Sequence, residues 1–134
     1  MSARNIFSNP SEITFPEGEQ LVSTTNLKGV ITYCNPSFCR VAGYSEQELI
    51  GQNHNIIRHP DMPKAAFADL WSCLRDGKAW RGIVKNQAKS GNFYWVDAYV
   101  TPIYENGQVT GYQSVRVKPK SQWVKVATEA YKQL

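Results

Sequence analysis

The chain has 134 residues and carries 15 Lys and Arg against 11 Asp and Glu, a formal net charge of +4. This length fits one domain, and a composition of 42% hydrophobic and 19% charged residues excludes a disordered chain. No stretch approaches the ~20 apolar residues that cross a bilayer, and the N-terminus leads into no apolar signal segment. We therefore expect a soluble cytoplasmic domain. The small, scattered excess of positive charge gives no reason to expect a nucleic-acid partner.

The three cysteines, Cys34, Cys39 and Cys73, show no Cys-x-x-Cys spacing. An odd, unspaced set does not fit a disulfide framework and favours a reducing compartment. We therefore expect a fold that depends on its hydrophobic core and not on covalent cross-links.

The first part of the chain predicts an arm and a β-hairpin. Residues 1–19 contain Pro10, Pro16 and Gly18 and show no sustained period, which indicates an extended N-terminal arm. Residues 21–25 and 30–34 are short β-like runs, and Gly29 between them can adopt the positive φ of a tight turn.

Two short helices follow the hairpin. Asn35-Pro36 is typical of an N-cap with proline at the first helical position, and Gly43 ends this helix. Residues 45–48 form a capping box for a second helix, which Gly51 ends. Helices this short must lie against a sheet to be stable.

The rest of the chain predicts a longer helix, three strands and a final helix. A polar loop at 52–62 precedes a helix at 63–76, whose apolar face consists of Phe67, Leu70, Trp71 and Leu74. Strands are expected at 80–88, 93–104 and 109–117. Beyond Pro119 the chain can form an amphipathic helix with Trp123, Val126, Ala127, Ala130 and Tyr131. The result is an α+β fold with a five-stranded antiparallel sheet: an arm at 1–19, a domain at 20–118 and a helical connector at 119–134.

The inward faces of two predicted strands carry small residues. Alternation places Gly82, Val84, Asn86 and Ala88 on one face of their strand, and Asp97 marks the outward face of the next. Such a face leaves volume beneath the single longer helix. Two interpretations are open: the short helices with Trp71 or Trp80 fill this volume, or it is a ligand cavity with Asn86 as its polar group.

The loop before the longer helix carries Arg58 and His59. A helix N-terminus beside a fixed cation favours anions, phosphate above all. Alternatively, Asp61 caps the helix and pairs with Arg58. Because a carboxylate repels phosphate, we assign Asp61 a capping or ribose-contacting role.

The order of elements and two motifs resemble a PAS sensor domain. The motifs are residues 34–38 (CNPSF) and 41–45 (VAGYS). Two further stretches are more specific, residues 54–71 (HNIIRHPDMPKAAFADLW) and 80–86 (WRGIVKN). They resemble the N-terminal PAS domain of bacterial aerotaxis receptors, over roughly residues 20–118.

The resemblance implies an FAD-binding redox sensor for aerotaxis. In that family, the residues that match Arg58, His59 and Asp61 are tied to FAD binding. Those that match Trp80 and Asn86 belong to the flavin pocket of related redox-sensing PAS domains. Asn35 and Arg116 are further candidates, although apolarity alone points Val115 and Val117 inward and Arg116 outward.

The resemblance also limits the chemistry. Photosensing flavin PAS domains place a reactive cysteine where this chain has His54, so no light-driven cysteinyl–flavin adduct is expected. The inward strand faces supply no carboxylate, His or Cys, which argues against an enzyme. A haem sensor with His54 or His59 as axial ligand and a cofactor-free dimerisation module remain alternatives.

Aerotaxis receptors of this family continue into a membrane anchor, a HAMP segment and a chemotaxis signalling domain. The expected partners are therefore FAD, these downstream domains and a second copy of the chain. The full-length receptor is expected at the inner membrane, with this domain on its cytoplasmic side.

Overall fold

A computed structural model describes residues 9–134, and the order of elements confirms the α+β prediction. The elements are β1 Leu21–Asn26, β2 Ile31–Cys34, α2 Pro36–Ala42, α3 Glu46–Leu49, the 3₁₀ helix η1 His54–Ile57, α4 Lys64–Arg75, β3 Trp80–Gln87, β4 Phe93–Glu105, β5 Gln108–Val117 and α5 Ser121–Lys132. The predicted loop at 52–62 thus contains η1, which the Asn53 side chain caps by accepting a hydrogen bond from the Asn55 backbone at 3.0 Å.

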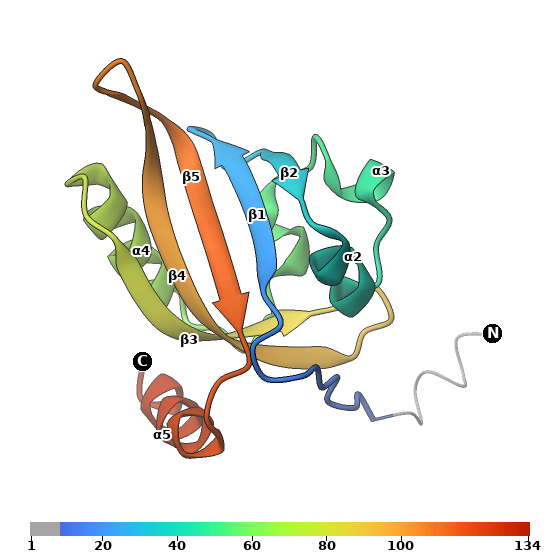
Figure 1. The fold of residues 1–134 in the computed structure, drawn as a ribbon. Coiled ribbons are helices and arrows are strands. Elements are labelled where there is room, and N and C mark those ends of the chain that lie inside the picture. The colour runs from blue at the N-terminus through green and yellow to red at the C-terminus, as the bar shows by residue number, and fades with distance from the viewer. Residues whose placement is uncertain (1–8) are drawn as a thin grey trace.

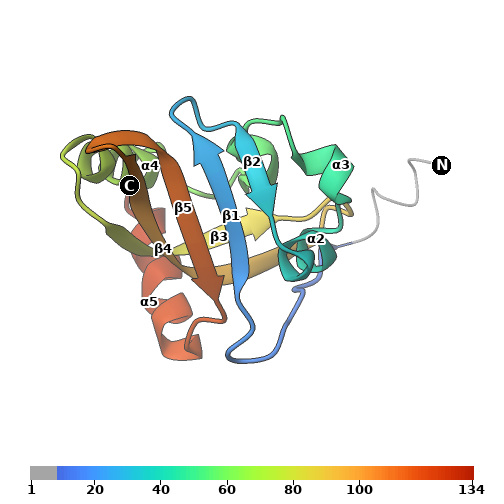
Figure 2. The same cartoon turned by 45° about the horizontal axis from the view of Figure 1, so that its top comes forward.

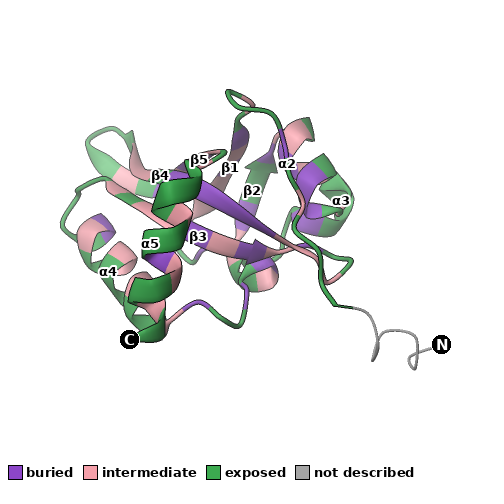
Figure 3. Cartoon of the chain, turned by 90° about the horizontal axis from the view of Figure 1, so that it is seen from below, coloured by how far each residue is buried: buried purple, intermediate pink, exposed green. Residues whose placement is uncertain are grey.

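The sheet has the strand order β2-β1-β5-β4-β3, and all neighbouring strands are antiparallel (Figures 1 and 2). Helices α2 and α4 and the η1 turn face its inner side. Helix α5 packs on the opposite side, beside β3 (Figure 3). There the Tyr131 hydroxyl donates to the Ile83 carbonyl, and the guanidinium of Arg81 lies 5.3 Å from the centroid of the Trp123 ring. In the described part of the chain, no helix is long and apolar enough to cross a membrane.

The caps of the two short helices are as predicted. The Asn35 side chain accepts from the Phe38 backbone N–H, and Gly43 ends α2 with φ 78°. Ser45 and Glu48 form the reciprocal capping box of α3. This helix ends at Leu49, with Ile50 as its C-cap, and is therefore shorter than the spacing to Gly51 suggested.

The described part of the N-terminal arm is docked on the domain. The Ile13 backbone N–H donates to the Phe93 carbonyl at 2.7 Å, and the Phe93 N–H donates to the Ser11 carbonyl at 3.1 Å. Phe15 is 6% exposed and belongs to the hydrophobic core. The arm therefore contributes to the core, which its irregular sequence did not indicate. Residues 1–8 of the predicted arm lie outside the described residues.

The segment at 51–58 crosses the inner face of the sheet from one edge to the other. At the β2 edge, the Gly51 N–H donates to the Ile31 carbonyl and the His54 N–H to the Gly29 carbonyl. At the β3 edge, Arg58 forms an isolated antiparallel bridge with Asn86. The same short segment thus forms hydrogen bonds with backbone groups at both edges of the sheet, and it covers the space between itself and the sheet.

Gly111 on β5 marks a close approach between strands. A Cβ at this position would lie 2.1 Å from the Thr25 carbonyl oxygen, a backbone atom that cannot move aside alone. We expect Gly111→Ala to lower the free energy of unfolding by about 1–3 kcal/mol, measured by chemical denaturation. The exposed neighbour provides the control, since Thr110→Ala should cost less than about 1 kcal/mol. Equal effects of the two substitutions would contradict this packing argument.

Candidate functional site

A cavity of about 250 Å³ lies between the inner face of the sheet, α4 and the segment at 51–58. The small side chains of β3 and β4 leave this space open, which rejects a fully packed interior and leaves a cavity with Asn86 in its lining. Most of its surface is apolar. The β3, β4 and α4 residues that line it are Ala66, Phe67, Leu70, Trp71, Leu74, Trp80, Val84, Asn86, Val96, Ala98 and Val100.

The predicted apolar face of α4 borders this cavity. Phe67, Leu70 and Trp71 are only half-buried, whereas Leu74 is 3% exposed. The Trp71 ring meets Tyr112 of β5 edge-on, with ring centroids 5.5 Å apart. A helix of this kind normally buries its apolar face against the sheet, so its incomplete burial reflects the cavity beneath it.

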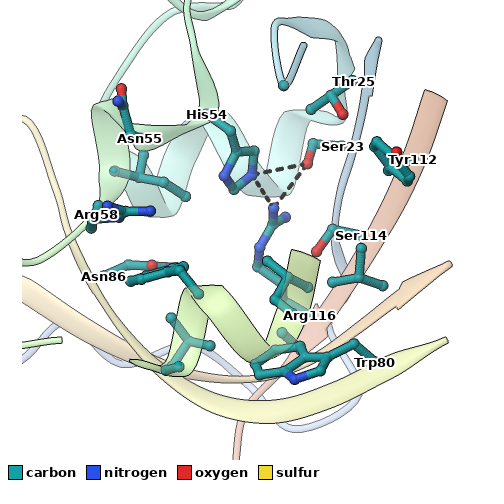
Figure 4. Close-up of a pocket in the computed structure, with 18 of the residues that line it drawn as sticks. Ser23, Thr25, His54, Asn55, Arg58, Trp80, Asn86, Tyr112, Ser114 and Arg116 are labelled. Carbon is teal, nitrogen blue, oxygen red and sulfur yellow. Dashed lines mark hydrogen bonds between the residues drawn. The ribbon is translucent and has the colours of Figure 1, made fainter. Parts of the chain in front are cut away.

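A buried cation lies at one side of the cavity (Figure 4). Arg116 is 2% exposed and donates to the Leu21 carbonyl at 3.2 Å, to the Ser23 hydroxyl at 2.9 Å and to His54 Nε2. Its guanidinium carbon lies 4.7 Å from the centroid of the Phe38 ring. Among residues 9–134 it forms no ion pair with a carboxylate, so its charge is held by neutral acceptors and an aromatic face alone.

Arg116 therefore faces inward, and the outward orientation expected from apolarity is wrong. Ser114 and Arg116 are buried, while Val115 and Val117 are half-exposed on the outer face. The reason is that β5 is central in the sheet. Its inward polar side chains therefore face the cavity and the His54 ring, whereas a packed core would require apolar side chains there.

The protonation of this cluster follows from its burial. Desolvation lowers the pKa of Arg116 to about 10, and Tyr94 partly offsets this effect. Desolvation, and then the nearby charges of Arg116 and Arg58, lower the pKa of His54 to about 3. His54 is therefore neutral near pH 7, and Nε2 is the nitrogen that accepts from Arg116.

Asn86 lines the cavity from β3 and is 4% exposed. Its amide can present both a donor and an acceptor to a ligand. Tyr94, its cross-strand partner, is fully buried, and the Tyr94 hydroxyl has no hydrogen-bond partner among the described residues. Burial raises the pKa of Tyr94, so this hydroxyl is a neutral donor. A buried polar atom of this kind ordinarily has a partner.

Trp80 and Arg58 also line the cavity. The Trp80 ring lies across Gly82, where an added Cβ would come within 2.3 Å of it, and its indole N–H donates to Asp69 at 2.8 Å. Arg58 is exposed, and its guanidinium carbon lies 3.7 Å from the centroid of the Phe67 ring. Together with exposed Asn55, Arg58 marks the side on which the cavity opens.

The other three candidate residues do not line the cavity. Asn35 caps α2 and also binds β1, since it accepts from the Val22 N–H at 3.1 Å. His59 is 8% exposed, and its Nδ1 accepts from the Asp61 N–H at 3.0 Å. In these positions, Asn35 and His59 shape the segments beside the cavity.

Asp61 does not cap α4, so that prediction is wrong. Pro63 is the N-cap and no side chain caps the helix. Asp61 pairs instead with Lys85 on the outer face of β3, at 2.9 Å, and not with Arg58. The pair forms because the loop that begins at Arg58 passes beside the edge strand. The Lys85 ammonium lowers the pKa of Asp61.

Sequence analysis missed the polar groups that surround Arg116. Ser23 lies one strand away on β1, and His54 hangs from η1, so no spacing in the sequence brings them together. The inward strand faces supply no His, but His54 of η1 reaches the cavity from outside the strands. Among the described residues that line the cavity there is no carboxylate and no cysteine.

The two histidines are poorly placed to bind a haem iron. Nε2 of His54 is already engaged by Arg116 and lies 3.5 Å from the Ser23 hydroxyl. His59 lies away from the cavity, and its Nδ1 accepts a backbone hydrogen bond. A haem ligand would require one of these contacts to break, which weakens the haem alternative.

Comparison with known proteins points to one family. The PAS fold model matches residues 31–116. The chain is 48% identical over 114 residues to the aerotaxis receptor of Escherichia coli, a match that covers 85% of this chain and 22% of the receptor. It is 38% identical over 82 residues to the nitrogen fixation regulatory protein of Klebsiella pneumoniae, covering 61% of this chain and 17% of that protein. The chain thus spans less than a quarter of either relative.

Solved structures share the fold. A light-oxygen-voltage domain studied with a flavin analogue superimposes with a TM-score of 0.75 at 19% identity, over 86% of this chain and 88% of that one. A PAS domain from Colwellia psychrerythraea superimposes with a TM-score of 0.69 at 26% identity, over 75% of this chain and 86% of that one. The α+β architecture with its five-stranded sheet is therefore that of the PAS and light-oxygen-voltage domains.

The lowered pKa of His54 predicts a pH dependence of stability. Its pKa is about 3 in the folded chain and near 6.5 when unfolded, so between these values only the unfolded chain binds the proton. The free energy of unfolding should therefore fall as the pH is lowered from about 6.5 toward about 3, by up to about 1.4 kcal/mol per pH unit from this group.

The free energy of unfolding of the His54→Gln variant, measured by urea denaturation, should depend less steeply on pH than that of the parent. His59→Gln serves as the comparison, because burial also lowers the pKa of His59, whose contribution has the same sign. A His54→Gln variant with the full slope of the parent would contradict the assignment.

Proposed function

This chain belongs to the PAS family, and from that premise we propose that it is a redox sensor domain whose cavity binds the ring of a flavin, with FAD as the cofactor. The observation that carries the proposal is the buried guanidinium of Arg116, which borders an apolar cavity and has no carboxylate partner among residues 9–134. A ligand with electron-rich oxygen and nitrogen atoms on one edge would supply the missing acceptors.

The donor set of the cavity fits a flavin. Arg116 offers a cationic donor, the Asn86 amide offers a donor and an acceptor, and apolar side chains from α4 and β4 supply two faces for a planar ring. These are the features expected of a cofactor pocket, in which a few polar groups orient a mainly apolar contact. A bound flavin would supply the redox chemistry, since its ring takes up electrons together with protons.

The opening of the cavity fits the phosphate-bearing part of the cofactor. The cavity volume of about 250 Å³ accommodates only part of an FAD molecule. At its opening, Arg58 forms no ion pair among the described residues, and its guanidinium stacks on Phe67. An exposed arginine held in this way can bind phosphate in a bidentate fashion, which supports Arg58 as the phosphate ligand.

The chain's own contacts offer a route from the cavity along β3 to α5, whose Tyr131 hydroxyl donates to the Ile83 carbonyl. Asn86 faces the cavity, and the next residue toward the N-terminus, Lys85, faces the outer side, where it pairs with Asp61. When the donors and acceptors of the ligand change, the Asn86 amide would rotate, and this rotation would displace β3. A difference of ~1–3 kcal/mol between two states is sufficient for such coupling.

Similarity to the aerotaxis receptor supports a role in aerotaxis signalling. Within this proposal the domain senses and does not catalyse, because the cavity offers no carboxylate or cysteine among its described lining residues. The absence of a lining cysteine also disfavours a photochemical adduct. The proposed partners are the downstream HAMP and chemotaxis signalling domains of a membrane-anchored receptor, with the domain on the cytoplasmic side and a homodimer as the working form.

Two neighbouring residues of β4 test flavin binding. Ala98 is 4% exposed and faces the cavity, whereas Tyr99 is 50% exposed on the outer face. We expect Ala98→Leu to fill the cavity and to weaken FAD binding at least about tenfold, or about 1.4 kcal/mol. The measurement is a titration of the cofactor-free chain with FAD, followed by flavin fluorescence. Tyr99→Leu should bind as the parent does, and equal FAD binding by the Ala98→Leu variant would contradict a flavin in this cavity.

A second pair of variants tests the signalling role of Asn86. Asn86→Ala should retain FAD but abolish the difference in hydrogen exchange between the oxidised and the reduced protein at Lys85 and in α5. Gln87→Ala, on the outward-facing next residue, should leave that difference in place. If the Asn86→Ala variant keeps the full difference, Asn86 is not the group that responds to reduction.

A further inference from the structure

Two cysteines meet at the start of α2, outside the cavity. Cys34 is the last residue of β2, Asn35 is the N-cap, and Cys39 lies on the first turns of α2. The residue before an N-cap and the fourth helical residue are neighbours in space, which is why an apolar pair often joins them. Here both positions hold cysteine, and the two Sγ atoms lie 3.7 Å apart.

We propose that Cys34 and Cys39 are a modification site, at which a small-molecule disulfide oxidises the two thiols to a reversible intramolecular disulfide. The inference does not depend on a flavin, because neither residue lines the cavity. Both thiols are free in the structure. To bond, the sulfur atoms need to approach from 3.7 Å to about 2.05 Å, a movement that the short helix α2 can supply.

Burial assigns the order of the two steps. Cys39 is partly exposed and can be reached by an oxidant, whereas Cys34 is 2% exposed. The thiolate of Cys39 attacks glutathione disulfide, so that a mixed disulfide forms and one glutathione leaves. The thiolate of Cys34 then attacks the Cys39 sulfur and releases the second glutathione. Two thiols lose two electrons and two protons, and one disulfide is reduced to two thiols.

The second step is slow for a free thiol but intramolecular here. Burial and the neighbouring Cys39 raise the pKa of Cys34 to about 12, so its thiolate is scarce near pH 7. A contact at 3.7 Å gives this thiol a high effective concentration at the reacting sulfur, which offsets the scarcity. Disulfides of this kind in reducing compartments are typically transient and responsive to redox conditions.

The position of the pair links it to the wall of the cavity. Phe38 directly precedes Cys39 on α2, its ring faces the guanidinium of Arg116, and its centroid lies 6.4 Å from that of His54. Drawing Cys39 toward Cys34 moves the first turn of α2 and with it Phe38. Thiol oxidation thereby changes the surroundings of Arg116 and His54, which line the cavity.

The tryptic map of the chain allows a direct test. Cleavage after Lys28 and Arg40 releases residues 29–40, which hold both cysteines of the pair, while Cys73 falls in residues 65–75. The protein is incubated with glutathione disulfide, denatured, alkylated with N-ethylmaleimide, digested and analysed by mass spectrometry. We expect the 29–40 peptide to lose two hydrogens and take up no alkyl group, and to take up two after dithiothreitol.

Single variants complete the test. Cys39→Ala should prevent the loss of two hydrogens, and Cys73→Ala should leave it unchanged. Hydrogen exchange at residues 54–58 should differ between the reduced and the oxidised chain and not in Cys39→Ala. A 29–40 peptide that carries two alkyl groups after oxidation, or a stable glutathione adduct on Cys39 alone, would overturn the site. Unchanged exchange at 54–58 would overturn its link to the cavity.

Discussion

The architecture depends on a buried positive charge. Arg116 holds together β5, β1, η1 and α2 through the Leu21 carbonyl, the Ser23 hydroxyl, the His54 ring and the Phe38 face. None of these acceptors is a carboxylate, and the cost of burying an arginine is large when no counter-charge is present. The proposed flavin would present to the cavity an edge that accepts further hydrogen bonds from this guanidinium.

The cavity exists because the inner face of the sheet carries small side chains and the segment at 51–58 lies across that face. Small side chains on β3 and β4 leave the volume, and the segment at 51–58 closes it by bonding to both edge strands. Since this segment also carries His54 and Arg58, the same few residues close the cavity, set its polarity and form its opening. The same segment thus joins the cavity to the sheet edge at Asn86.

Local signals in the sequence predicted most of the fold, because caps and strand alternation act over a few residues. The Asn35 cap and the inward face of Asn86 were found in this way. Contacts made across the sheet were not predictable: Phe15 reaches the core from an irregular arm, and His54 meets Arg116 from a segment 62 residues away. The resemblance made Arg116 a candidate, but apolarity alone pointed it outward. Alternation shows which residues share a face, and it does not show that a cavity lies beneath that face in place of an apolar core.

The most direct test of the account is the visible absorption spectrum of the purified protein, before and after reduction with dithionite, with chromatography of the released cofactor. The account predicts the two absorption bands of an oxidised flavin, their bleaching on reduction and the release of FAD. A Soret band would instead indicate a haem and would contradict the assignment of the cavity. A colourless protein that does not take up added FAD would contradict the central claim, and the unpaired charge of Arg116 would then require another explanation.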